Sequence, residues 1–188
     1  MRLFIAVEFP EDIRLALERD ARTLRRVLRS GTLSRRENYH LTLVFLGETD
    51  RAGERRAAEA MEQCRTGSFP LVIGAPGRFR GREGDTIWRN VDGGEALLSL
   101  HEALTDALRE RGFRPEERAY TPHLTLARRA VFGGGSSFGA LRDQFSPLRC
   151  IADGMMLMLS ERPGGVLTYT PRHRTPFYET DKLFDQGR

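Results

Sequence analysis

The sequence is poor in lysine and in cysteine, and it has no long apolar run. A single lysine, Lys182, stands among 30 basic residues, and the rest are arginine. The two cysteines, Cys64 and Cys150, lie far apart and outside any C-x-x-C pattern, which argues against a disulfide framework and against a cysteine zinc site. No segment approaches the roughly 18 consecutive apolar residues of a membrane span. We therefore expect a soluble, cytoplasmic protein without a membrane partner.

The N-terminal stretch "MRLFIAVEFPED" lacks the features of a secretion signal. Its apolar run turns acidic at once, no extended positive region precedes the run, and no small-residue cleavage site follows it. We predict that residues 3–9 form a first strand instead.

The excess of arginine gives the chain a formal net charge of +4, which favours an anionic partner. The planar guanidinium fork suits the oxygens of phosphate. A bias in genome composition would explain the excess of arginine equally well. Net charge informs about association and does not identify a particular site. Charge therefore permits a nucleic-acid partner without establishing one.

A length of 188 residues suits one domain or two small lobes that share a core. Hydrophobic periodicity divides the chain into two halves, each of which reads strand, helix, strand, helix, strand. The glycine-rich segment 133–139 is expected to be a flexible connector, and it lacks the lysine of a nucleotide-binding loop. The expected elements of the first half are 3–9, 10–31, 40–46, 57–64 and 69–73, and those of the second half are 87–91, 97–112, 123–127, 138–145 and 155–160.

The tetrad His-Leu-Thr-Leu occurs in each half, at residues 40–43 and again at 123–126. The copies lie 83 residues apart, which suits a duplicated lobe and not a solenoid repeat. Two lobes, each with a small antiparallel-type sheet and outer helices, would bring the tetrad strands together across a central groove. We predict this bilobal α+β fold, in which residues 1–188 form a single domain with interleaved lobes. The approximate repeats are 1–82 and 83–160, and a hairpin over 155–175 follows.

The tetrads carry residues suited to phosphodiester chemistry. Side chains alternate along a strand, so His40 and Thr42 share one face, and so do His123 and Thr125. Two imidazoles across a groove can take and give protons at neutral pH, and two hydroxyls can hydrogen-bond phosphate oxygens. A single His-x-Thr in an apolar strand is most often structural. The matched repetition favours a functional pair, and hence attack on a phosphodiester without a metal.

The remaining histidines and a metal site offer the alternative interpretations. His101 lies beside the leucine stripe of a predicted helix and His173 lies in a basic stretch, so we expect packing or surface roles for them. His40 and His123 could begin a metal site, but the tetrads supply hydroxyls where zinc prefers nitrogen, sulfur or carboxylate. We therefore expect neither a metal nor a cofactor.

The paired motifs "NYHLTLVFLG" and "PHLTLARR", together with the start "RLFIAVEFP" and the late run "MMLMLS", give the chain a family resemblance over nearly its whole length. It resembles the 2H phosphoesterase superfamily, and within it the RNA 2′,3′-cyclic phosphodiesterases, historically called 2′-5′ RNA ligases. The resemblance implies a bilobal fold with a pseudo-twofold axis. It also implies metal-independent hydrolysis of 2′,3′-cyclic phosphate ends of RNA to 2′-phosphomonoesters.

The resemblance further implies roles for single residues. His40 corresponds to the general acid toward the 3′ oxygen, and His123 corresponds to the general base toward water. Thr42 and Thr125 correspond to donors to the phosphate oxygens.

Arg128 matches a basic position after the second motif that contacts phosphate or nucleotide. On a flat strand it would face away from His123, so either the strand bends there or Arg129 has that role.

Other activities remain open at this level. A 2′-5′ RNA ligase or another cyclic-nucleotide phosphodiesterase of the same superfamily would use the same residues. A non-catalytic RNA-binding module would hold phosphate without turnover. In each case we expect RNA or a cyclic nucleotide as the partner of a monomeric protein.

Overall fold

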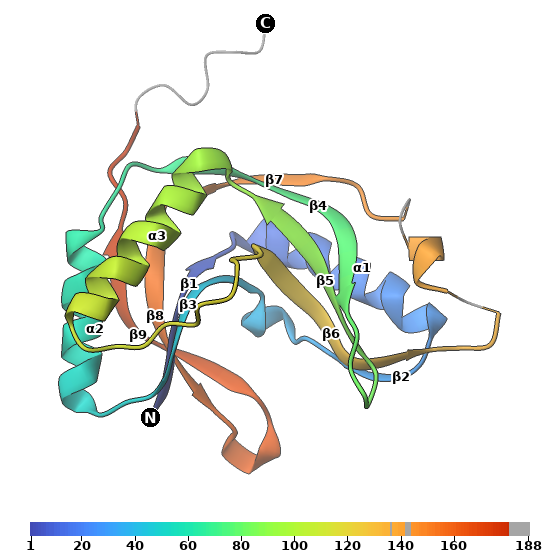
Figure 1. Ribbon diagram of the computed structural model, residues 1–188. Helices are drawn as coiled ribbons and strands as arrows, with labels where there is room; N and C mark the ends of the chain where they lie inside the picture. Colours follow the sequence, from blue (N-terminus) through green and yellow to red (C-terminus); the bar gives the residue numbers. More distant parts are fainter. Residues whose placement is uncertain (136, 142–143, 181–188) are drawn as a thin grey trace, which may run out of the picture.

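The computed structural model describes residues 1–135, 137–141 and 144–180 and has an α+β architecture (Figure 1). Three kinds of element follow one another along the chain. The strands are β1 (Arg2–Glu8), β2 (Leu28–Leu33), β3 (His40–Glu48), β4 (Phe69–Phe79), β5 (Asp85–Asp92), β6 (His123–Phe132), β7 (Leu148–Ala152), β8 (Gly154–Glu161) and β9 (Thr168–Pro176). The α-helices are α1 (Glu11–Val27), α2 (Arg51–Gln63) and α3 (Gly94–Glu110), and the 3-10 turns are η1 (Arg36–Asn38), η2 (Phe138–Leu141) and η3 (Pro163–Gly165).

The strands form two antiparallel sheets, a four-stranded sheet of order β3-β1-β8-β9 and a five-stranded sheet of order β2-β6-β5-β4-β7. Each tetrad strand lies beside the first strand of its own half, β3 beside β1 and β6 beside β5. The third strand of each half joins the other sheet, so β8 pairs with β1 and β4 pairs with β5. This arrangement confirms the predicted bilobal fold class. The repeat boundaries and the single-domain assignment stay predictions.

The helices also cross between the sheets. Helix α1 follows β1 but packs against β6 and β7, whereas α3 follows β5 but packs against β3, and α2 packs against β8 and β9 (Figure 1). Their apolar faces join the core, where Leu17, Leu41, Leu104 and Leu124 are completely buried. The helices thus cover the core sides of the sheets, and the polar residues of the tetrads lie on the opposite faces.

The first helix is shorter than predicted. Its apolar stripe was expected to run through Leu28 to Gly31, but α1 ends at Val27 and the next residues form β2, which pairs with β6. Leu28 is buried, but it belongs to β2 and not to α1. Gly31 has a φ of 140°, and a Cβ on it would lie 2.9 Å from the Ala130 Cα. Pairing with β6 therefore overrides the helical periodicity at this point.

The other predicted elements differ from the observed helices and strands mainly at their ends. Asp50 caps α2 by accepting a hydrogen bond from the Gly53 amide at 2.7 Å, and Cys64 lies just beyond the last turn. Strand β4 continues past the predicted 69–73, and β5 begins before Ile87. The predicted helix 138–145 is a short 3-10 turn in its described part. Residues 136, 142 and 143, which belong to the connector and this helix, lie outside the described residues.

Within the described residues, we find no helix with the length and hydropathy that crossing a bilayer requires.

Candidate active site

The two tetrads meet at one cavity of about 290 Å³ between the sheets. His40 and Thr42 reach it from β3, and His123 and Thr125 reach it from β6. Arg128 lines the same cavity. The tetrad leucines point into the core and are almost completely buried, which anchors both strands. The structure therefore brings all five predicted site residues together.

The same backbone contact orients both imidazoles. Nδ1 of His40 lies 2.8 Å from the carbonyl oxygen of Asn38, and Nδ1 of His123 lies 2.6 Å from that of Thr121. A carbonyl oxygen only accepts, so Nδ1 carries the proton and donates in each ring. Nε2 of each histidine is thereby left as the nitrogen that can exchange a proton with a ligand.

Both imidazoles are held in the neutral form. Burial lowers the pKa of His40 from 6.5 to about 4, against the opposing effect of the hydrogen bond to Asn38, and the charge of Arg128 lowers it further. Burial and the charge of Arg128 also lower the pKa of His123. In neutral His40 the Nε2 atom accepts, and the Thr42 hydroxyl donates to it over 3.0 Å. The protein without ligand thus presents two bases to the cavity.

Aromatic rings fix the position of each imidazole. Each histidine contacts two of them at 4.9 to 5.7 Å between ring centroids, namely Phe4 and Tyr169 for His40, and Phe79 and Trp88 for His123. These rings come from β1, β9, β4 and β5. No motif in the sequence marks them, because their role depends on which strands become neighbours of the tetrads.

A β-bulge in β6 resolves the orientation of Arg128. Thr125 lies opposite Trp88 and Ala127 lies opposite Ile87, so Leu126 is an extra residue on β6. Leu126 and Ala127 are consecutive, yet both are completely buried. The alternation of faces therefore shifts by one residue after the bulge.

This shift returns Arg128 to the face of the tetrad histidine and threonine, where it lines the cavity. The following residue, Arg129, has a φ of 51° and forms an exposed ion pair with Glu83 at 3.5 Å. Of the two alternatives that the sequence left open, the strand departs from a flat strand at this point. Arg128, and not Arg129, lies at the candidate site.

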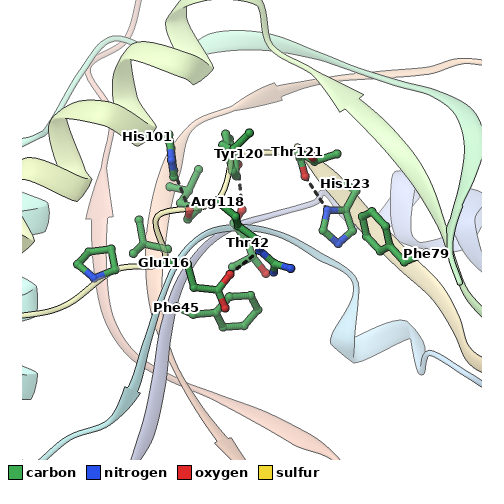
Figure 2. Close-up of a pocket in the computed structure, with 13 residues that line it drawn as sticks. Thr42, Phe45, Phe79, His101, Glu116, Arg118, Tyr120, Thr121 and His123 are labelled. Atoms are coloured by element: carbon green, nitrogen blue, oxygen red, sulfur yellow. Dashed lines mark hydrogen bonds and ion pairs between the residues drawn. The ribbon is translucent and has the colours of Figure 1, made fainter. Parts of the chain in front are cut away.

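A second, apolar compartment of about 200 Å³ adjoins the first and shares Thr42, Phe45 and His123 with it (Figure 2). Phe45 and Phe79 line it from the two sheets and remain 43% and 42% exposed. Tyr120 forms the wall between α3 and the second tetrad, and its hydroxyl donates to the Thr42 carbonyl over 2.9 Å. The compartment therefore offers flat aromatic surfaces beside the polar groups of the tetrads.

The two remaining histidines lie outside the polar cavity. His101 stacks flat on Tyr120, with 3.9 Å between ring centroids, and its Nδ1 donates to the Leu43 carbonyl over 3.0 Å. It lines the apolar compartment as a packing residue of the wall. His173 lies at the surface, where its Nε2 is 2.8 Å from a carboxylate oxygen of Glu62.

The donors around the cavity are imidazoles, hydroxyls and guanidinium groups. Across the described part of the chain, no three or more His, Cys, Asp and Glu side chains are grouped so as to hold a metal ion. The cavity can thus offer proton transfer through two Nε2 atoms and charge-assisted hydrogen bonds to an anion.

Comparisons with known proteins find curated relatives of this chain. A curated RNA 2′,3′-cyclic phosphodiesterase of Thermotoga maritima is 31% identical over 137 residues, which is 68% of this chain and 70% of that protein. A second, from Geobacillus stearothermophilus, is 29% identical over 184 residues, which is 96% of this chain but 56% of that protein.

Solved structures share the fold. The crystal structure of TT0787 of Thermus thermophilus superposes with a TM-score of 0.78 at 25% identity and covers 95% of this chain and 99% of that one. E. coli LigT complexed with 3′-AMP superposes with a TM-score of 0.77 at 23% identity, over 94% and 97% of the two chains. The model of the 2′-5′ RNA ligase superfamily matches residues 12–163. The chain therefore belongs to the 2′-5′ RNA ligase superfamily.

Proposed function

We propose that this protein hydrolyses the 2′,3′-cyclic phosphate ends of RNA to 2′-phosphomonoesters, without a metal. The observation that carries the proposal is the meeting of two His-x-Thr pairs and Arg128 at one cavity. The family and the names of the curated relatives support the hydrolysis of a 2′,3′-cyclic phosphate.

The reaction needs proton transfer on two sides of the phosphorus. A water oxygen attacks phosphorus while Nε2 of His123 takes its proton. The bond from phosphorus to the 3′ oxygen breaks on the opposite side, and Nε2 of His40 gives that oxygen a proton. One proton is taken up and one is released, so the pair returns to its starting state by exchanging a proton with solvent.

The substrate itself supplies what His40 needs in order to act as an acid. Its pKa of about 4 makes it neutral before binding. A cyclic phosphate carries a negative charge, and an opposite charge close to an imidazolium favours the protonated form. Once Nε2 is protonated, the rotatable Thr42 hydroxyl can donate to a phosphate oxygen instead of to His40.

The remaining groups bind the phosphate and the terminal base. Thr42, Thr125 and Arg128 donate to the non-bridging oxygens, where negative charge develops as phosphorus becomes five-coordinate. The exposed rings of Phe45 and Phe79 suit a planar base, because unpaired bases stack on aromatic side chains.

The direct test is hydrolysis of the four 2′,3′-cyclic mononucleotides in the presence of EDTA. The wild-type protein should release 2′-phosphates, and His40→Ala and His123→Ala should each abolish turnover while keeping the wild-type circular dichroism and melting temperature. Full activity in both variants would refute the proposal. A 3′-phosphate product would overturn the assignment of His40 as the acid toward the 3′ oxygen.

The family description also favours a second candidate, 2′-5′ ligation. An oligonucleotide that ends in a cyclic phosphate, incubated with a 5′-hydroxyl acceptor, separates joining from hydrolysis by the length of the product. A cyclic-nucleotide phosphodiesterase with another substrate would fail this RNA assay but hydrolyse mononucleotides. A binding module would show salt-dependent affinity and no product. The cytoplasmic location, the monomeric state and the independence from metal stay predictions.

A further inference from the structure

The polar cavity extends past the tetrads to an end rich in arginine. Arg2, Ser160 and Arg162 line this end, together with the residues of the candidate active site. Arg2 and Ser160 face each other in the pairing of β1 with β8, and Arg162 directly follows β8. We call these three residues the arginine end of the cavity.

The arginine end lies along β1 from the first tetrad. Ala6 lies opposite Thr42 in the pairing of β1 with β3, and Arg2 precedes Ala6 by four residues. At about 3.3 Å per residue, Arg2 lies roughly 13 Å along β1 from the residue beside Thr42. Phe4 points to the same face between them and lines the cavity. The backbone of Arg2 is therefore displaced along β1 from the first tetrad.

The charges at this end are not neutralised within the described residues. Arg2 and Arg162 form no ion pair there, and no Asp or Glu of the described residues lines the cavity. The carboxylate closest to Arg2 in the strand pairing is that of Glu48, which pairs with the amino group of Met1 at 3.1 Å.

Arg162 lies in the turn of the hairpin formed by β8 and β9. The other arginines of this hairpin are paired with carboxylates. Arg172 pairs with Glu54 at 2.6 Å, and Arg174 pairs with Asp153 at 3.0 Å. Arg162, by contrast, lines the cavity and forms no ion pair within the described residues. An unmatched cluster of guanidinium groups beside a phosphate site favours a second anion.

Contacts with the first tetrad fix the position of the hairpin. The Asn38 side-chain amide donates to the Leu167 carbonyl over 2.9 Å, and the ring of Tyr169 lies against His40. Asn38 is also the residue whose carbonyl orients His40. The hairpin that carries Arg162 is therefore positioned relative to the imidazole.

We propose that Arg2 and Arg162 bind the phosphate on the 5′ side of the terminal nucleotide, so that the enzyme prefers RNA ends to free cyclic mononucleotides. This inference rests on the proposed function. The terminal base then lies on Phe45 and Phe79, the cyclic phosphate lies at the tetrads, and the preceding phosphate reaches the arginine end. A cyclic mononucleotide has one phosphate and leaves Arg2 and Arg162 unused.

The test compares kcat/KM for a dinucleotide that ends in a 2′,3′-cyclic phosphate with kcat/KM for the cyclic mononucleotide of the same terminal base. The wild-type protein should prefer the dinucleotide. Arg2→Ala and Arg162→Ala should each lower kcat/KM for the dinucleotide by about 10- to 100-fold, the loss of a charge-assisted hydrogen bond, and leave the mononucleotide unchanged. Both positions are exposed, so the fold should persist.

Arg55→Ala is the matched control. Arg55 is exposed on α2, whose buried residues belong to the main core and not to the cavity. This variant removes the same charge and should leave both substrates unaffected. As a binding readout, a product dinucleotide with a 2′-phosphate should bind the two cavity variants, but not the Arg55 variant, more weakly than the wild type.

The outcomes distinguish the two levels of the proposal. If the wild-type protein hydrolyses both substrates equally well, or if both substrates lose equally in Arg2→Ala and Arg162→Ala, the 5′ phosphate site is refuted and the hydrolytic function stands. If the wild-type protein hydrolyses neither substrate, the proposed function fails and this inference fails with it.

Discussion

The protonation of His40 allows a quantitative test of the site. Its pKa is lowered from 6.5 to about 4, mainly by burial. This change weakens proton binding by roughly 300-fold, and about one molecule in 1,000 carries the proton at pH 7. An NMR titration of the His40 ring, assigned with a His40→Asn variant, should therefore show its midpoint far below that of an ordinary histidine.

Two perturbations should raise this pKa. The guanidinium of Arg128 disfavours the imidazolium, so Arg128→Gln should raise the pKa of His40 and of His123. The rise should be smaller than the effect of burial, which is the larger cause, and His40 should still titrate below 6.5. A bound 2′-nucleotide places negative charge beside the ring and should also raise the pKa.

The same shifts set the pH dependence of turnover. The pH profile of kcat/KM reports the free enzyme, whose two imidazoles both have lowered pKa values. The optimum should therefore lie below pH 6.5, kcat/KM should fall as the pH rises through neutrality, and Arg128→Gln should move this fall to higher pH. A His40 midpoint at or above 6.5 in the protein without ligand, or a midpoint that Arg128→Gln leaves in place or lowers, would refute the reasoning.

Three further predictions concern the threonines of the tetrads, Tyr120 and Arg89. Thr42→Ala and Thr125→Ala should each lower kcat by ~10²- to 10³-fold, because each removes one donor to the developing oxyanion. Serine at the same position should restore kcat. A change in KM alone would contradict the role of these threonines as oxyanion donors. Tyr120→Phe keeps the ring but removes the bond to the Thr42 carbonyl. It should lower the unfolding free energy by about 1 kcal/mol and reduce kcat more than it changes KM; an unchanged kcat would leave Tyr120 a packing residue. Arg89 is completely buried and donates to Asp20 and to three backbone carbonyls. Arg89→Ala should therefore lower the free energy of unfolding, measured with urea, by ~3–5 kcal/mol. A decrease below ~1 kcal/mol would contradict this prediction.

Local patterns predicted most of the secondary structure. The apolar stripes of α1 and α3 and the strands around both tetrads lie where periodicity placed them, because these patterns reflect burial of one face. The clearest error is the stretch from Leu28 to Gly31. It continues a helical stripe in the sequence, but its backbone groups pair with β6. Helical preference is worth well under 1 kcal/mol per residue, and tertiary pairing readily overrides it.

The sequence by itself determined which residues are the candidates for the chemistry. The alternation of side chains in a strand is a local rule, so His40 with Thr42, and His123 with Thr125, could be placed on common faces from their spacing alone. The repetition of the tetrad indicated that the two pairs act together, and it indicated the superfamily.

The tertiary structure alone decided how those residues are held and what surrounds them. The bulge at Leu126 depends on the partner strand β5, and it turns Arg128 into the cavity. Arg2 and Arg162 are 160 positions apart in the sequence and meet only because β1 pairs with β8. Strand pairing joins segments that are distant along the chain, and no local pattern of side chains encodes which segments will meet.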